Sequence, residues 1–278
     1  MSKIFRYIAI GLLVLGFAII VITISKFGTV SINLPPDPHK LSDFGAFIGG
    51  LVGSIFSLAV ALFIYITFVE SKQVAFESTF FNMLKIHNDL VNDISFEDVS
   101  KLITGRRCFK KFYDILRGGY LNSKTEFSHD KNIKWIQKNS GLKIKESHPE
   151  ILYKINPPGI DEEVNDEFQI EFAQYIFNDL YDNQNANLNH YFRFLYHIIK
   201  TIDESTISGK KKYTGIMRAN LSSYEQILLF YNTIWMGQNG KFKRLIEKYK
   251  LFKNIQTELV FNDVHTSFYD KKAFGNDD

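Results

Sequence analysis

Two long runs of apolar residues near the start of the chain constrain its architecture most strongly. The first run, residues 4–24, contains one charged residue, Arg6, and the second run, residues 44–69, contains none. Each run is long enough to cross the roughly 30 Å hydrocarbon core of a bilayer as a helix. A short proline-rich polar segment separates them, and proline interrupts a helix. The pattern predicts a two-helix transmembrane hairpin over residues 1–69.

The charges around these runs bear on topology. Lys3 and Arg6 also resemble the basic start of a signal peptide, but the run that follows is longer than such a segment and no small-residue cleavage site follows it. Basic residues flank both runs in nearly balanced numbers. The rest of the chain contains a single cysteine, Cys108, so no disulfide forms within it. We therefore expect both termini to lie in the cytoplasm.

Small residues recur at every fourth position of the second run, at Gly45, Gly49, Gly53, Ser57 and Ala61. In lipid, small residues allow two helix backbones to approach closely. Two interpretations follow from this stripe. It packs the second span against the first, or it packs copies of the protein together as an oligomer or a pore wall.

The pattern of residues 70–278 predicts a cytoplasmic α-helical domain. The expected fold class is therefore all-α, with a transmembrane hairpin followed by a soluble helical bundle. The second span is expected to continue as a helix to about residue 94, and no strand pattern of any length is evident. Gly118 and Gly119 are expected to end the next helix. A tail from about Thr266 is expected to be frayed. Further helices are expected at 133–138, 165–182, 187–205, from Ser222 onward, and at 240–252.

Charge is separated within this domain although the net charge of the 278 residues is only +3, which argues against wholesale binding of nucleic acid. Residues 161–182 carry eight acidic side chains and no basic one, whereas residues 204–253 carry ten lysines and arginines against three glutamates. Such blocks are typical of solvated faces of opposite sign. Alternatively, the basic block contacts anionic lipid or a nucleic acid.

One polar group of residues lies on a single face of the helix expected at 187–205. On a helical wheel, His190, Arg193 and His197 lie opposite the apolar face that centres on Leu195. Helical ribonucleases of the HEPN class use an arginine and a histidine separated by four to six residues, whereas only three residues separate Arg193 from His197. Arg193 and His197 are candidate catalytic residues if the protein is a ribonuclease. Otherwise this is a solvated or interface face.

The helix expected to begin at Ser222 carries a second polar group. Glu225 stands three residues after Ser222, as in a capping box. Glu225 and Asn232 lie on the flank of its apolar stripe, where a carboxylate is costly unless it is paired. We expect Glu225 to be buried and ion-paired, with Arg218 or Arg193 as its partner. No metal-ligand set, cofactor motif or other catalytic signature is evident.

Several segments carry a family resemblance. The sequences YFRFLYHIIKTID, YTGIMRANLSSYEQILLFYN and KFKRLIEKYKLFKNI resemble the AbiC-like phage abortive-infection family, and FFNMLKIHNDLV and GRRCFKKFYDIL are similar to its amino-terminal blocks. The resemblance covers most of residues 80–255, and the two-span start is similar to membrane effectors of retron anti-phage systems. It implies Arg218, Glu225 and Asn232 as a shared polar core, and it implies no catalytic residues.

The resemblance and the apolar runs together predict an anti-phage effector of the bacterial inner membrane. In this hypothesis the cytoplasmic domain senses infection through an unknown phage-derived trigger, and the hairpin disrupts the membrane. Expected partners are the lipid bilayer, further copies of the chain, and a reverse transcriptase or nucleic acid of the defence system. The alternatives are a membrane-tethered HEPN-like ribonuclease and a non-enzymatic membrane scaffold.

Overall fold

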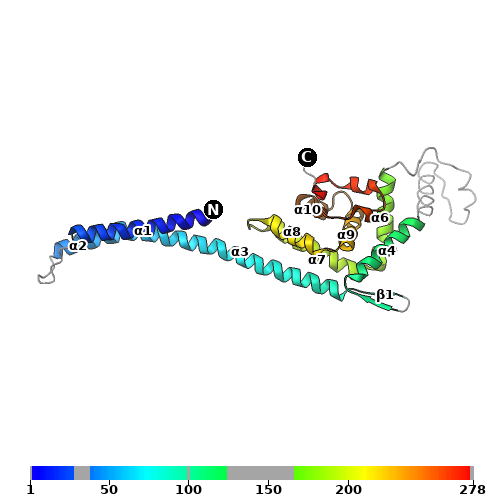
Figure 1. Ribbon diagram of the computed structural model, residues 1–278, viewed down its shortest axis with the longest axis horizontal. Coiled ribbons are helices and arrows are strands. Elements are labelled where there is room, and N and C mark those ends of the chain that lie inside the picture. The colour runs from blue at the N-terminus through cyan, green and yellow to red at the C-terminus, as the bar shows by residue number, and fades with distance from the viewer. Residues whose placement is uncertain (1, 28–37, 99–100, 124–165, 276–278) are drawn as a thin grey trace, which may run out of the picture. The chain divides into compact units, whose positions relative to one another are not determined.

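A computed structural model describes residues 2–27, 38–98, 101–123 and 166–275 (Figure 1). The expected all-α class is confirmed, because two long apolar helices are followed by a helical domain with very little strand. In chain order the elements are α1 (Ser2–Phe27), α2 (Pro38–Phe47), the π-helix η1 (Ile48–Val52), α3 (Gly53–Asp93), β1 (Ser95–Asp98), β2 (Lys101–Thr104), α4 (Arg107–Asn122), α6 (Asp166–Asn183), α7 (Asn185–Glu204), α8 (Lys210–Asn220), α9 (Ser223–Met236), α10 (Lys241–Tyr249), and the 3-10 helices η3 (Thr257–Leu259), η4 (Asp263–Phe268) and η5 (Lys271–Phe274).

The chain divides into two compact units, Met1–Thr79 and Phe80–Asp278. Two helical stretches are long and apolar enough to cross a membrane, Ile4–Lys26 and Ser42–Asp93. Only 17% and 11% of the residues in their most apolar windows are buried, so neither stretch is covered by protein as the core helix of a soluble domain would be.

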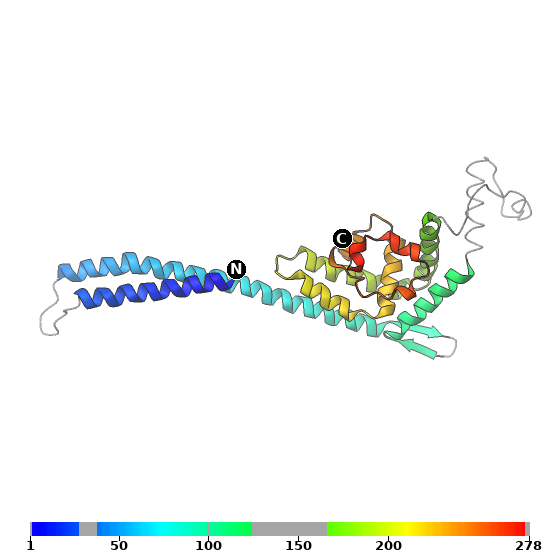
Figure 2. The ribbon, with the colours of Figure 1, turned by 45° about the horizontal axis from the view of Figure 1, so that its top comes forward.

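In the first unit, α1 lies antiparallel to the first part of α3 (Figures 1 and 2). The rings of Phe5 and Tyr65 lie 5.8 Å apart between centroids, and those of Phe17 and Phe56 lie 5.7 Å apart. At the open end of this hairpin, Arg6 Nη2 donates to Glu70 Oε1 at 2.7 Å. The two apolar runs therefore pair as expected.

The contact face of this hairpin repeats every seven residues. On α1 the buried positions of this face are Ala9 and Gly16. On the facing helix they are Val52 of η1 and Ala59 and Ile66 of α3. A seven-residue step drifts by only about 20° on an α-helix, so such a row stays against its partner over several turns. The small side chains at positions 9, 16 and 59 allow the backbones to approach closely.

The four-residue stripe lies elsewhere. Gly45, Gly49, Ser57 and Ala61 are exposed, and a Cβ atom added at Gly45 or Gly49 would meet nothing within 4 Å. A four-residue step gains about 40° of rotation, so the stripe winds away from the seven-residue contact row. Gly53, half-buried, would meet only the Ile48 carbonyl oxygen. The interpretation that the stripe packs against the first span is therefore wrong. The interpretation that it packs copies of the protein together stays a prediction.

Helix α9 is the central helix of the second unit. Every residue from Glu225 to Ile234 is buried, which means that the helix is covered on all sides. Helices α4 and α6 pack against α9 and against each other. Helix α7 presents to this core the apolar face predicted from its wheel, with Leu195 fully buried.

The carboxyl-terminal segment is part of this core, so the expectation of a frayed tail from Thr266 is wrong. His265 is 0% exposed, and Phe268 and Tyr269 are buried. Tyr269 Oη donates to the Phe230 carbonyl oxygen at 2.6 Å, which ties the tail to α9. The segment is short and irregular, and its aromatic side chains rather than a regular helix hold it in place.

Two local expectations also fail. Strands β1 and β2 form an antiparallel ribbon before α4, with Ser95 paired to Thr104, although no strand was expected (Figure 2). Four residues are too few for a recognisable two-residue period. Helix α4 continues through Gly118 and Gly119. A Cβ atom at Gly119 would lie 3.1 Å from Ile176 Cγ2, so this glycine permits the close approach of α4 and α6. The helix expected at 133–138 lies outside the described residues.

We predict that Gly16→Leu disrupts the hairpin whereas Gly11→Leu does not. A Cβ atom at Gly16 would lie 2.3 Å from the ring of Phe56, but one at Gly11 would meet nothing within 4 Å. Both changes add the same apolar side chain to the same helix. The melting temperature of the purified full chain in detergent should fall for Gly16→Leu only. Equal melting temperatures for the two variants would show that α1 and α3 do not pack through Gly16.

Candidate functional site

A polar cluster centred on a buried carboxylate lies where five helices of the second unit meet. We call it the Glu225 cluster. Its members come from the last turns of α3, the residue that precedes α4, the middle of α7, the end of α8 and the first turn of α9. They are His87, Asn88, Arg106, Tyr191, Asn220, Ser222 and Glu225.

The Glu225 carboxylate is the centre of the cluster and is 0% exposed. Its Oε2 accepts the Ser222 backbone N–H at 2.8 Å, while Ser222 Oγ accepts the Glu225 N–H at 3.3 Å. The capping box expected from the sequence is thus present, and it satisfies backbone N–H groups that a helix start leaves unpaired. The other carboxylate oxygen, Oε1, accepts Tyr191 Oη–H at 3.2 Å.

Arg106 is the ion-pair partner of Glu225. Its Nη1 lies 3.3 Å from Glu225 Oε2, and its Nη2 donates to Asn88 Oδ1 at 3.3 Å. Burial and pairing of Glu225 are confirmed, but the expected partners are wrong. Arg218 donates to the Lys250 carbonyl oxygen instead, and Arg193 lies on the exposed face of α7 beside Asn189.

His87 connects α3 to this cluster. Asn220 Nδ2 lies 3.3 Å from His87 Nδ1 and donates to Asn88 Oδ1 at 3.0 Å. Because Nδ1 accepts from an amide, the neutral ring carries its proton on Nε2, which is buried without a hydrogen-bond partner. Burial, with a smaller contribution from the Arg106 charge, lowers the pKa of His87 to about 4. His87 is therefore neutral at physiological pH.

Tyr191 closes the cluster on the α7 side. Its ring centroid lies 5.3 Å from that of His87 and 4.7 Å from that of Phe109. Burial and the adjacent Glu225 carboxylate raise the pKa of Tyr191 well above its usual range. The phenol therefore remains protonated and serves as a permanent donor to Glu225.

The predicted polar core of Arg218, Glu225 and Asn232 is not assembled as one group. Among the contacts of the described residues, none joins Arg218 or Asn232 to Glu225. Asn232 stands about two turns further along α9, is 2% exposed, and its Oδ1 is buried without a partner. Only Glu225 of this set belongs to the cluster.

The candidate ribonuclease residues lie on a separate surface. His190, Arg193 and His197 are all exposed, as the helical wheel of α7 predicted. Within the described part of the chain, no group of three or more histidine, cysteine, aspartate or glutamate side chains could hold a metal ion.

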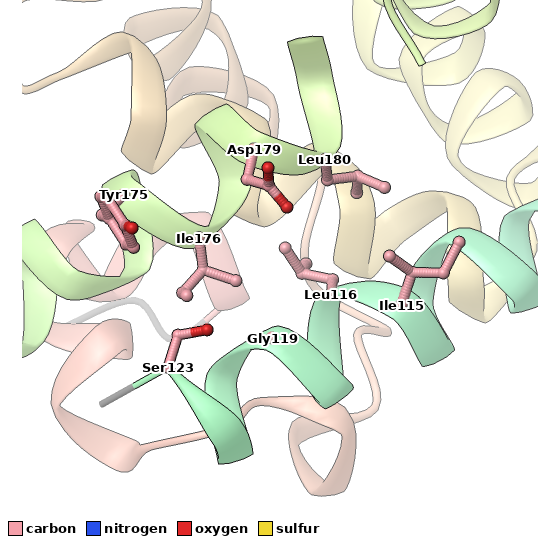
Figure 3. Close-up of a pocket in the computed structure, with 8 residues that line it drawn as sticks. All are labelled: Ile115, Leu116, Gly119, Ser123, Tyr175, Ile176, Asp179 and Leu180. Atoms are coloured by element: carbon pink, nitrogen blue, oxygen red, sulfur yellow. The ribbon is translucent and has the colours of Figure 1, made fainter. Parts of the chain in front are cut away.

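A hollow of about 220 Å³ lies between α4 and α6 (Figure 3). Ile115, Leu116 and Gly119 line it from α4, and Ile176 and Asp179 face them from α6. It is smaller than the roughly 300–1,000 Å³ of a typical small-molecule site. None of the candidate site residues named from the sequence lines this hollow, so we assign no function to it.

The arrangement of the Glu225 cluster supports positioning rather than catalysis. Both oxygens of Glu225 are occupied, and the side chain has no access to solvent. The cluster instead fastens the end of α3 to α4, α7, α8 and α9 through directional bonds. Sequence reasoning missed His87, Asn88 and Arg106, because only the fold brings these distant segments to the start of α9.

Comparison with known proteins gives one family match. The sequence model of the family putAbiC, described as "Putative phage abortive infection protein", matches residues 183–260. No curated protein and no solved structure matches the chain significantly. The matched region runs from α7 to η3 and contains Tyr191, Asn220, Ser222 and Glu225 of the cluster. It links this part of the chain to phage abortive infection.

We predict that Glu225→Ala lowers the free energy of unfolding by about 2–4 kcal/mol, the cost of a lost helix cap together with a buried hydroxyl left without its acceptor. The change removes the cap of α9 and the acceptor of Tyr191 Oη, whereas Arg106, 41% exposed, stays in contact with water. Denaturant unfolding of the full chain in detergent measures this loss. The control is Glu258→Ala on the exposed surface, which should have little effect. A loss below about 1 kcal/mol would contradict the assigned role of Glu225.

The free energy of unfolding should also decrease as the pH falls below about 6.5. His87 and His265 have pKa values of about 4 in the folded chain, chiefly through burial, against 6.5 when exposed. The unfolded chain therefore takes up protons first, and stability is lost progressively until the pH reaches about 4. From about pH 7.5 to about pH 5, we expect a loss of about 2 kcal/mol per histidine.

The two histidines can be tested separately in the same unfolding measurement. His265→Gln should reduce the pH dependence by about half, whereas the exposed control His197→Gln should leave it unchanged. An unfolding free energy that is flat over this pH range would show that neither ring is buried in its neutral form.

Proposed function

We propose that the protein is an anti-phage abortive-infection effector of the bacterial inner membrane. In this proposal the helical unit responds to infection and the apolar hairpin then disrupts the membrane. The observation that carries the proposal is the abortive-infection match at residues 183–260, in a chain whose first unit is built from two long apolar helices.

The outward side chains of the hairpin support a membrane location. Val14, Val21 and Ile64 are each more than 60% exposed on the helices that pair through small residues. Contiguous exposed apolar surface of this kind is unfavourable in water and favourable in lipid. We propose that both helices span the membrane, with both termini in the cytoplasm.

The Glu225 cluster supplies a physical route for the response. His87 and Asn88 lie in the last turns of α3, the helix that also carries the second apolar run. Asn220 and Arg106 hold these two residues to the helical unit. A trigger that changes the packing of the matched region would alter how α3 is held, and a helix transmits such a change along its length.

Copies of the chain are proposed to associate within the membrane. The stripe from Gly45 to Ala61 is not used inside the hairpin and is free of side chains that would prevent close approach. A reverse transcriptase or nucleic acid of the same defence system is a further proposed partner. The resemblance alone suggests that partner, and the phage-derived trigger is not identified.

A membrane-tethered ribonuclease is the second candidate. Arg193 and His197 are both exposed on the same face of α7, within the region matched by the abortive-infection family. Such a pair could supply a general base and a positive charge to a phosphodiester. A non-enzymatic membrane scaffold is the third candidate, and it would leave both the membrane and cellular RNA intact.

We predict that the double variant Arg193→Ala/His197→Ala retains protection against phage, because neither residue performs chemistry in the membrane proposal. The measurement is the plating efficiency of phage on cells that express the variant, with total RNA examined in parallel. Both side chains are exposed, so the variant should accumulate normally. Complete loss of protection by a stable double variant, together with RNA cleavage by the unaltered protein, would favour the ribonuclease.

A further inference from the structure

Six cations of α8 and α10, five of them exposed and Lys210 half-buried, gather on one side of the second unit. Helix α10 has Lys241, Arg244 and Lys248 on one face, because residues three and seven positions apart align on a helix. Lys210, Lys211 and Lys212 form the first turn of α8. We call these six side chains the α8–α10 cationic surface.

Contacts around Asp203, near the end of α7, join the two helices. Lys248 Nζ pairs with its carboxylate, and Lys210 Nζ donates to its backbone carbonyl oxygen at 2.6 Å. At the other end of α10, the rings of Phe242 and Tyr196 lie 5.5 Å apart, so α10 runs along α7. The neighbouring carboxylate of Glu204 pairs with Lys200 on α7 instead. Lys243 is not part of the surface, because its side chain is only 15% exposed and pairs with Glu247 at 2.7 Å.

Four of the six cations, Lys210, Lys211, Lys212 and Lys241, stand at helix starts, where helix electrostatics disfavours them. Both α8 and α10 begin after a glycine that makes no side-chain cap, and neither has an acidic residue in its first turn. A helix start carries partial positive charge, so lysine there is unfavourable unless an anion is nearby. Lys210 is compensated by the Asp203 carbonyl oxygen, whereas the exposed Lys211, Lys212 and Lys241 break this local rule. Such a break indicates a role outside the fold.

The lysine end of α8 lies at the side of the unit where α3 enters it. The rings of Phe80 and Tyr213 lie 5.2 Å apart, and His87 contacts Asn220 seven residues further along each helix. Helix α8 is therefore parallel to the last turns of α3, with its lysines beside Phe80. Residues 70–79 join Phe80 to Val69, the last apolar residue of the second run, and they span at most about 40 Å whatever their course.

We infer that the α8–α10 cationic surface binds the anionic lipid headgroups of the leaflet into which the hairpin is inserted. This inference rests on the proposed membrane location. The short connection keeps the surface at a high effective concentration near that leaflet. Basic side chains near anionic lipid are attracted within roughly a Debye length, about 8–10 Å. The surface thereby orients the helical unit on the membrane.

Anionic lipid fits this surface better than a nucleic acid does. Binding of single strands relies on exposed aromatic rings for base stacking. Among the described residues of the second unit, the exposed large apolar side chains do not fall on α8 or α10, and the rings of Tyr213 and Phe242 are buried. Headgroup phosphates need only mobile cations, which the six lysine and arginine side chains supply.

The test is acetylation of lysines in the full chain reconstituted into nanodiscs, read by mass spectrometry. One set of discs contains phosphatidylcholine alone and the other also contains phosphatidylglycerol. We expect acetylation of Lys211 and Lys212 to fall about fivefold in the anionic discs, which corresponds to the ~1 kcal/mol that a basic residue gains at such a surface. Lys101, exposed on β2, serves as the internal reference.

A charge-reversal variant tests the surface as a unit. Lys211→Glu/Lys212→Glu/Arg244→Glu should remove the lipid-dependent protection of Lys241 and Lys248. The matched control is Arg107→Glu/Lys110→Glu/Arg117→Glu, which reverses three exposed cations on one face of α4 and should keep the protection. All six positions are exposed, and unchanged melting temperatures show that both variants fold.

Three results would overturn the inference. Equal acetylation in neutral and anionic discs would do so while leaving the proposed membrane effector intact. Protection by an added RNA or DNA oligonucleotide, but not by phosphatidylglycerol, would reassign the surface to nucleic acid. A chain that does not enter nanodiscs would refute the membrane location, and the proposed function would fail with the inference.

Discussion

The burial of one carboxylate at the start of α9 is the interaction on which the helical unit depends. Helix α9 is covered on all sides, and hydrophobic burial alone is non-directional, so it does not fix how such a helix is rotated or how far it is advanced. Glu225 fixes both. The capping box sets the first residue of the helix, and Tyr191 and Arg106 set its orientation toward α7 and α4. Through Asn88 and Asn220 the same network holds the end of α3.

The apolar hairpin follows a different rule, because its helices meet through small residues at seven-residue intervals. Ala9, Gly16 and Ala59 bring the backbones together, while large apolar side chains point outward. The four-residue row of small residues that begins at Gly45 winds to the outside of this pair. The hairpin thus has one surface for its internal contact and a second, smooth surface that no part of the described chain covers.

Sequence periodicity predicted the elements that are long and locally encoded. The apolar face of α7, the capping box at Ser222 and the two apolar runs depend on residues a few positions apart. Arg106 could not be identified as the partner of Glu225, because the pair forms only after α4 and α9 have packed. Gly119 was interpreted as a helix stop because its contact with Ile176 lies on another helix. The ordered tail was missed because Tyr269 and His265 are held by α9 and α6 rather than by a helix of their own.

In the proposed function, infection leads this protein to break the electrical barrier of the inner membrane. The most direct measurement is the membrane potential of single infected cells that express the full chain, recorded together with the integrity of their RNA. If the hairpin disrupts the membrane, the potential collapses after infection while RNA is still intact, and uninfected cells keep their potential. A potential that is maintained while RNA is degraded would contradict the claim.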